Sequence, residues 1–74
     1  MLFATGTVGK FKVKILSPVE GDFEDAKHIA HMLGANCIDD VRIIDGEIVN
    51  GVPQGVERYK VEPDGYGHAV EATK

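Results

Sequence analysis

The sequence lacks most of the features that stabilise or anchor other kinds of small protein. It has one cysteine, Cys37, so no disulfide can form within the chain, although small secreted domains usually depend on disulfides. No apolar run approaches the roughly 20 residues that cross a membrane. The first residues carry neither the basic nor the apolar region of a secretory signal. We therefore expect a cytoplasmic protein with no membrane partner.

Recognisable catalytic motifs are also missing. Residues 6–10, Gly-Thr-Val-Gly-Lys, contain part of a phosphate-binding loop, but its spacing is absent and a strand follows where a helix is needed. Cys37 is soon followed by two aspartates, whose charge disfavours the thiolate of a catalytic cysteine. A chain of 74 residues also has little room for a ligand pocket of the usual size, about 300–1,000 Å³. The sequence predicts that the protein is not an enzyme and needs no cofactor.

Two histidines are the candidates for a metal site. His28 and His31 are three residues apart in a segment of helical pattern, and a pair at this spacing can hold a metal ion. The zinc-protease motif, in which a glutamate lies between two histidines four residues apart, is not present. We expect both side chains on the exposed side of the helix, where the alternative to a metal site is an ordinary solvated surface.

One amphipathic helix is predicted in the middle of the chain. Asp22 is expected to cap its start, with Asp25 as the second member of a capping box. Gly34 is expected to end the helix in the left-handed conformation. Apolar residues recur between these ends at helical spacing. They are Phe23, Ala26, Ile29, Ala30 and Leu33.

A β-strand is predicted before this helix. Residues 10–15 alternate lysine with Phe11, Val13 and Ile15, which is typical of a strand with one face in the core. Residues 3–8 are also β-prone, and the glycines near them leave two options. They form either part of one long bent strand or a short strand followed by a turn.

The segment after the helix predicts a hairpin and a last strand. The hairpin turn is either Asp45-Gly46 or Asn50-Gly51. Residues 56–62 form the last strand, and residues 63–74 are predicted to be a flexible C-terminal tail because no periodicity remains. The fold class is α+β. A single helix is expected on one face of a three- to four-stranded, mostly antiparallel sheet, in the order β-α-β-β-β, within one domain of residues 1–62.

Most of the basic residues are predicted to share one face of this sheet. The net charge is −4, yet the acids gather at the start of the helix and in loops. Six of the eight basic residues lie on the predicted strands, on the side opposite the apolar residues: Lys10, Lys12, Lys14, Arg42, Arg58 and Lys60. A solvent-facing strand often carries lysine for solubility alone. The functional interpretation is that this face docks an acidic partner.

The kind of partner depends on what lies between these charges. A protein complex with an acidic surface and a nucleic acid both offer negative charge. Phe11 and Tyr59 are predicted to point into the core, which leaves no aromatic platform for stacking single-stranded bases. The sequence therefore favours a protein partner over nucleic acid. Exposed edge strands offer a second docking mode, by strand addition, including a homodimer.

The order of elements around the helix resembles that of small phage-encoded inhibitors of host complexes, such as those of bacterial RNA polymerase or of CRISPR effectors. The resemblance is carried by residues 22–30, Asp-Phe-Glu-Asp-Ala-Lys-His-Ile-Ala, with a strand and an acidic turn before them and a glycine and a strand after them. It implies a non-catalytic protein-interaction module, a phage or mobile-element accessory that binds and modulates a host complex. The alternative is a small nucleic-acid-binding protein that uses the same basic face.

Overall fold

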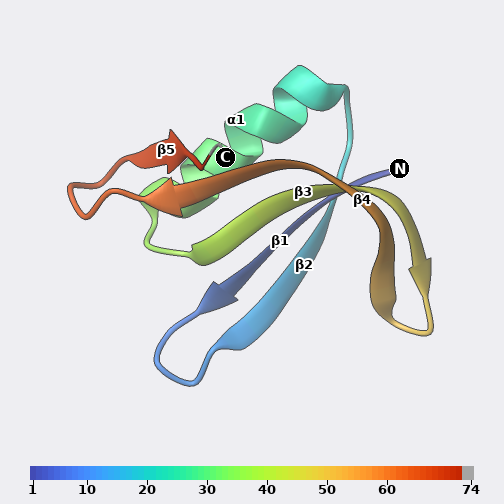
Figure 1. The fold of residues 1–74 in the computed structure, drawn as a ribbon, viewed down its shortest axis with the longest axis horizontal. Helices are drawn as coiled ribbons and strands as arrows, with labels where there is room; N and C mark the ends of the chain where they lie inside the picture. The colour runs from blue at the N-terminus through green and yellow to red at the C-terminus, as the bar shows by residue number, and fades with distance from the viewer. Residues whose placement is uncertain (73–74) are drawn as a thin grey trace.

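The computed structural model describes residues 1–72 as one helix packed against a five-stranded antiparallel sheet (Figure 1). The elements in chain order are β1 (Leu2–Val8), β2 (Val13–Val19), α1 (Phe23–Ala35), β3 (Asp39–Val49), β4 (Val52–Pro63) and β5 (Ala69–Glu71). Neighbours in the sheet follow the order β2-β1-β3-β4-β5. The α+β class is confirmed. The predicted count of three to four strands and the order β-α-β-β-β are wrong, because two strands, not one, precede the helix.

The first two strands form a hairpin, so of the two options for residues 3–8 the short strand followed by a turn is confirmed, whereas the strand predicted over residues 10–15 begins only at Val13. Gly9 and Lys12 have φ of 75° and 53°, and the Lys12 N–H donates to the Gly9 carbonyl at 3.1 Å. Residues 9–12 are therefore a turn, and Phe11 within it is 85% exposed. Val13 is 59% exposed, so the expected core face of this segment exists only from Ile15 onward. Alternation in the sequence continued through the turn and concealed it.

The predicted helix start is confirmed and its end is corrected. The Asp22 carboxylate accepts from the Asp25 N–H at 3.0 Å, and the Asp25 carboxylate accepts from the Asp22 N–H at 3.1 Å, which completes the capping box. The predicted stop, Gly34, lies inside the helix and is buried. The residue in the left-handed conformation is Cys37, with φ of 63°. Its N–H donates to Gly34 O, and the Ile38 N–H donates to Leu33 O, which is the Schellman pattern one turn further on.

Gly34 has a packing role that explains why a glycine occurs there. A Cβ at this position would lie 2.5 Å from the Cβ of Ala69, so the missing side chain lets β5 approach the helix. β5 pairs with the end of β4 through Val61–Glu71, Glu62–Val70 and Pro63–Ala69. The prediction of a tail from residue 63 thus differs from the structure, which extends β4 to Pro63 and adds β5. Residues 73–74 of that predicted tail lie outside the described residues.

The second hairpin settles the choice between two turns. Asn50 and Gly51 have φ of 53° and 78°, as a two-residue type I′ turn requires, and Val49 pairs with Val52 across it. Asp45-Gly46 lies within β3, where Gly46 pairs with Gly55. A Cβ on Gly46 would meet the Gln54 carbonyl oxygen and the Gly55 Cα. This close approach accompanies the bend at which the outer half of the hairpin curls out of the sheet (Figure 1).

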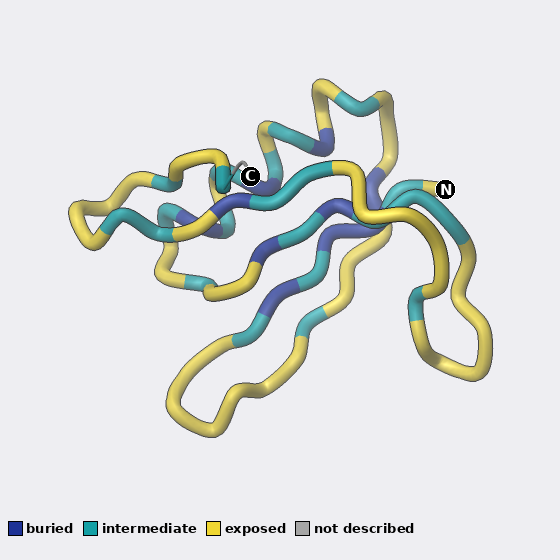
Figure 2. Tube along the Cα trace, viewed as in Figure 1, coloured by how far each residue is buried: buried dark blue, intermediate teal, exposed yellow. Residues whose placement is uncertain are grey.

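The core lies between α1 and the inner strands. It is built from small and branched side chains that are fully buried: Ala4, Ala26, Ala30, Val41, Ile43 and Val61. α1 packs on β1, β3, β4 and β5. Burial is concentrated where the helix crosses the sheet, and both hairpin ends extend beyond it into solvent (Figure 2).

Candidate functional site

The strand register assigns each side chain to one of two sheet faces. Ala4, Ile43 and Tyr59 are successive partners across β1, β3 and β4, and they belong to the core under the helix. The next row is Leu16, Thr5, Arg42 and Lys60. Because neighbouring rows point to opposite faces, this second row lies on the face that α1 does not cover, the open face. Lys14 pairs with Thr7 and lies on the same face.

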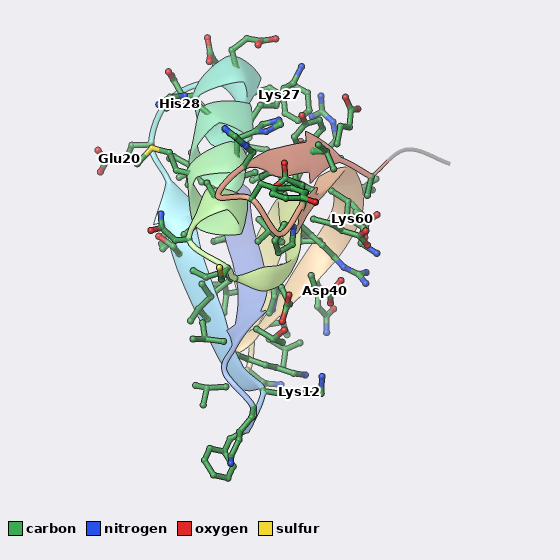
Figure 3. The ribbon with its side chains drawn as sticks, turned by 90° about the vertical axis from the view of Figure 1, so that its left-hand side faces the viewer. Lys12, Glu20, Lys27, His28, Asp40 and Lys60 are labelled. Atoms are coloured by element: carbon green, nitrogen blue, oxygen red, sulfur yellow. The ribbon has the colours of Figure 1, made fainter. Side chains whose placement is uncertain are left out.

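The structure does not bring the six predicted contact residues together. Lys14, Arg42 and Lys60 are on the open face, whereas Lys10 and Lys12 are in the turn at the end of the first hairpin. Figure 3 shows Lys12 at the opposite end of the molecule from Lys27 and His28. Arg58 is the extra residue at the shift of register between β3 and β4. Its guanidinium carbon lies 4.5 Å from the centre of the Phe23 ring, toward the helix.

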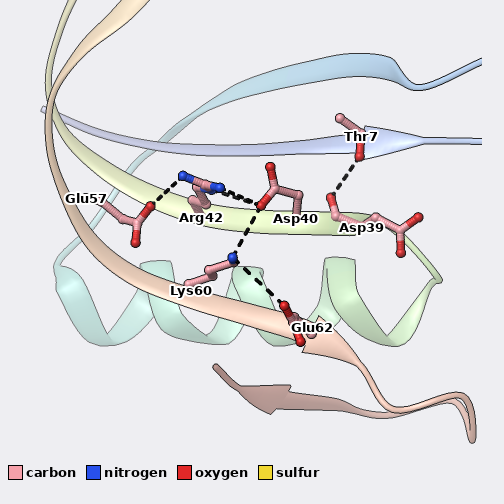
Figure 4. A network of polar contacts seen from close by, with 7 residues as sticks. All are labelled: Thr7, Asp39, Asp40, Arg42, Glu57, Lys60 and Glu62. Carbon is pink, nitrogen blue, oxygen red and sulfur yellow. Dashed lines mark hydrogen bonds and ion pairs between the residues drawn. The ribbon is translucent and has the colours of Figure 1, made fainter. Parts of the chain in front are cut away.

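Two of the open-face cations are engaged by carboxylates (Figure 4). Arg42 contacts Asp40 at 2.8 Å and Glu57 at 2.8 Å. Lys60 lies 3.7 Å from Asp40 and 3.9 Å from Glu62. The hydrogen bond to Asp40 raises the pKa of Arg42, against a smaller opposing effect of burial. Three acids therefore surround two bases, and this part of the open face is not a positive surface.

Arg58 is likewise paired. Its guanidinium donates to the Asp45 carboxylate at 3.1 Å. The other oxygen of Asp45 is 3.4 Å from the amino terminus of Met1. Arg58 therefore joins β4 to β3 and to the start of β1, and its charge is balanced within the fold.

The three lysines of the first hairpin are different. Within residues 1–72, Lys10, Lys12 and Lys14 have no carboxylate within ion-pair distance. The Lys10 ammonium lies 5.9 Å from the centre of the Phe11 ring, the reach of a cation–π contact. We call residues 10–14, Lys-Phe-Lys-Val-Lys, the basic tip. It combines three free cations with two exposed apolar side chains.

A groove adjoins the basic tip on the open face. Its volume is about 460 Å³, and it lies between the first hairpin and the curled half of the second. Leu16, Ile44, Val52 and Pro53 supply apolar lining, and Thr5, Thr7, Lys14, Asp40 and Arg42 supply polar groups. Sequence reasoning missed this groove, and its expectation of little room for a hollow of this size is wrong. The paired glycines at the bend were the available signal, since they let the second hairpin curl over the sheet.

The two candidate metal ligands point in different directions. His28 is exposed, whereas His31 is half-buried and contacts Ala69 O through Nδ1 at 3.1 Å and the Tyr59 hydroxyl through Nε2 at 2.6 Å. Because a carbonyl only accepts, Nδ1 carries a proton, and in the neutral ring Nε2 accepts from Tyr59. Both nitrogens of His31 are thus engaged, and its predicted exposed orientation is wrong. Residues 1–72 contain no group of three or more His, Cys, Asp or Glu side chains placed to hold a metal ion.

Comparison with family models, with curated protein sequences and with solved structures finds no significant match to this chain. In the described part of the chain, the helix has neither the length nor the apolar character needed to cross a membrane. The basic tip with its adjoining groove is the candidate site.

Proposed function

We propose that this protein is a non-catalytic interaction module that docks an acidic surface of a partner protein through the basic tip. The observation that carries the proposal is the environment of Lys10, Lys12 and Lys14. They are cations without a carboxylate partner in residues 1–72, on an exposed hairpin end. On the resemblance to small phage inhibitors, the partner is a complex of a host cell that this chain modulates.

The exposed side chains of the tip add binding energy to this charge. Phe11 is 85% exposed and Val13 is 59% exposed, so both lose water when a partner covers them. Interfaces concentrate their energy in such aromatic anchors, whereas surrounding charges mainly set the rate and selectivity of association. The lysines would therefore select an acidic surface, and Phe11 would hold it.

Single-stranded nucleic acid is the second candidate, and the position of Phe11 favours it. The sequence predicted Phe11 in the core, which removed any stacking platform, whereas the structure exposes its ring beside three lysines. Base stacking on an aromatic ring is tolerant of sequence. With three phosphate contacts, the logarithm of the affinity should fall with the logarithm of salt concentration with a slope of about −2.

Affinity capture from lysate, with and without nuclease, tests the function. A protein complex that remains bound after nuclease treatment supports the protein-interaction module. Capture that is lost after nuclease treatment would mean that the basic tip binds nucleic acid. The same capture is repeated with Lys12→Glu/Lys14→Glu. We expect these two reversals to weaken binding on the order of 100-fold, since each places a negative charge against an acidic partner.

A matched reversal separates the tip from net charge. Lys27→Glu on α1 changes the net charge as much as the single variant Lys12→Glu does and half as much as the double variant, so Lys12→Glu alone is measured beside it; Lys27 lies beside Glu24 on the helix. Binding by the Lys27 variant should persist, with thermal unfolding used to show that each variant is folded. Full binding by the Lys12→Glu/Lys14→Glu variant would remove the basic tip as the contact surface.

A further inference from the structure

The strand that carries Lys14 is a free edge of the sheet. In the described part of the chain, residues 1–72, β2 pairs with β1 alone, and it is seven residues long, whereas the opposite edge strand, β5, has three residues. An unpaired edge is a template for an added strand. Seven residues can hold several ladder hydrogen bonds, which three cannot. β2 is therefore the edge on which a partner segment can be built.

Pro18 shows which backbone groups of β2 face outward. It pairs with Phe3 of β1, and because proline has no N–H, it suits a position that points away from the ladder. Outward and inward positions alternate along an antiparallel strand. The N–H and carbonyl groups of Lys14 and Leu16 therefore share the outward direction of Pro18 and are available to a partner strand.

The groove lies beside this edge and is lined by the same two residues. Lys14 and Leu16 both line it, with Val52 and Pro53 of the second hairpin. Alternate residues of a strand lie on the same face, about 6.6 Å apart. An added strand would therefore direct alternate side chains into the groove, one beside Lys14 and the next beside Leu16.

The charges in the groove indicate which side chains of an added strand would fit there. Arg42 and Asp40 form an ion pair at 2.8 Å. Lys14 is therefore the groove cation that can pair with a carboxylate of the partner. Next to it, the apolar lining of Leu16, Val52 and Pro53 favours an apolar side chain of the partner. A second copy of the chain does not fit this requirement, because Lys14 is the one charged residue of Val13–Val19. Pairing β2 with β2 would add positive charge and no acid.

We infer that the partner docks by adding an extended acidic segment to the edge of β2. One carboxylate of that segment pairs with Lys14, and the side chain two residues away is apolar and enters the groove beside Leu16. The main-chain hydrogen bonds supply affinity, and the alternating acidic and apolar side chains supply selectivity. This inference rests on the proposed function and names the form and chemistry of the partner segment.

Selection from a display library of random ten-residue peptides tests the inference on the full chain. Enriched peptides should carry Asp or Glu two positions from an apolar residue. Their binding should fall at least tenfold in Lys14→Glu and remain in Lys27→Glu. When such a peptide is bound, amide hydrogen exchange at Lys14 and Leu16 should slow, with no change along β5.

A pair of variants at one position isolates the backbone contribution. Leu16→Ala removes the apolar side chain, and Leu16→Pro removes the outward N–H as well. We expect Leu16→Pro to bind the selected peptides at least tenfold more weakly than Leu16→Ala, with circular dichroism showing that both are folded. Equal binding by the two variants, enrichment without acidic residues, no enrichment at all, or a dimer that Leu16→Pro dissociates would each overturn the inference.

The two proposals can fail separately. If Lys12→Glu/Lys14→Glu loses the captured partner while Leu16→Pro retains it, the basic tip is the contact surface and strand addition is wrong. If the selected peptides bind as expected but capture from lysate depends on nuclease, the edge of β2 accepts acidic segments and the protein-interaction function is wrong.

Discussion

The two hairpins of the sheet carry equal numbers of the six predicted contact residues, yet their charges have opposite fates. Lys10, Lys12 and Lys14 in the first hairpin have no carboxylate within reach in residues 1–72. In the second hairpin, each basic residue is paired: Arg42 with Asp40 and Glu57, Arg58 with Asp45, and Lys60 with Asp40 and Glu62.

For the residues on strands, the cause is the neighbour that each strand has in the sheet; Lys10 and Lys12 lie in the turn before β2. β2 is at the edge, and among residues 1–72 its strand partner is β1, whose sequence Leu-Phe-Ala-Thr-Gly-Thr-Val contains no charged residue. β3 and β4 are neighbours and both carry acids. A lysine beside an uncharged strand keeps its charge available, whereas an arginine beside an acidic strand is used within the fold. The first hairpin is thus the one suited to an external partner.

The largest expected effect comes from the glycines that shape the two hairpins. Gly46→Ala should lower the free energy of unfolding by about 3 kcal/mol, because its Cβ would meet the backbone of Gln54 and Gly55. Gly9→Ala is the matched change in the other hairpin. Within residues 1–72, no atom beyond its two chain neighbours would lie within 4 Å of the added Cβ, and the φ of 75° is the unfavourable feature, so Gly9→Ala should cost about 1 kcal/mol. Urea unfolding measures both.

The same pair of variants also tests the groove. Because the bend at Gly46 positions Val52 and Pro53 against the sheet, Gly46→Ala should also weaken peptides selected on the edge of β2, whereas Gly9→Ala should not. Equal stability losses in the two hairpins would show that the second hairpin is not held by the close approach of Gly46 and Gly55.

The electrostatic contrast can be removed by giving β1 an acid. Thr7 is the register partner of Lys14, so Thr7→Glu places a carboxylate beside that cation. Because Lys14 would then be paired within the fold, the Thr7→Glu variant should bind the partner about tenfold more weakly, as measured by titration calorimetry. Thr7→Gln has the same length without the charge and also loses the hydrogen bond from Thr7 to Asp39 O. Similar binding by both variants would contradict the claim that a free Lys14 matters.

The local parts of the fold could be predicted from the sequence. The capping box at Asp22 and Asp25 and the stripe of apolar helix residues depend on neighbours within about one turn, and the structure confirms them. The inward position of Tyr59 is also confirmed, since period-two alternation held along that strand. Each of these features is set by residues close to one another in the chain.

The features that were missed depend on distant residues. Gly34 was read as a stop, but its role is set by Ala69 of β5, a contact between segments far apart in sequence. Phe11 was assigned to the core because alternation cannot show that Gly9 turns the chain. The pairing of Arg42 with Glu57 required the register of β3 and β4. The sequence therefore identified the six basic residues, whereas their separation in the structure and the division of their charges between free and paired could not be predicted from it.

The smallest expected effect on stability concerns the hydrogen bond that attaches the second hairpin to the helix. The Tyr59 hydroxyl of the second hairpin donates a hydrogen bond to Nε2 of His31, and Nδ1 of His31 donates to the Ala69 carbonyl. Tyr59→Phe should cost about 1 kcal/mol at neutral pH, since it leaves the acceptor of His31 without its partner. Tyr66→Phe is the matched control. Because Tyr66 is 86% exposed, this change should leave the free energy of unfolding of the protein unchanged.

The effect of Tyr59→Phe should depend on pH in a defined direction. Burial, with smaller contributions from Glu71 and Glu24, raises the pKa of Tyr59 in the folded state. The folded protein then holds the phenol proton more tightly than the unfolded chain does, so this stabilisation is complete below pH about 10 and is lost as the pH rises further. Urea unfolding at pH 7 and above pH 10 should show the difference between wild type and Tyr59→Phe becoming smaller, with no such change for Tyr66→Phe. A difference that stays constant would mean that the pKa of Tyr59 is the same in the folded and unfolded protein, so that burial of this side chain does not favour its neutral form.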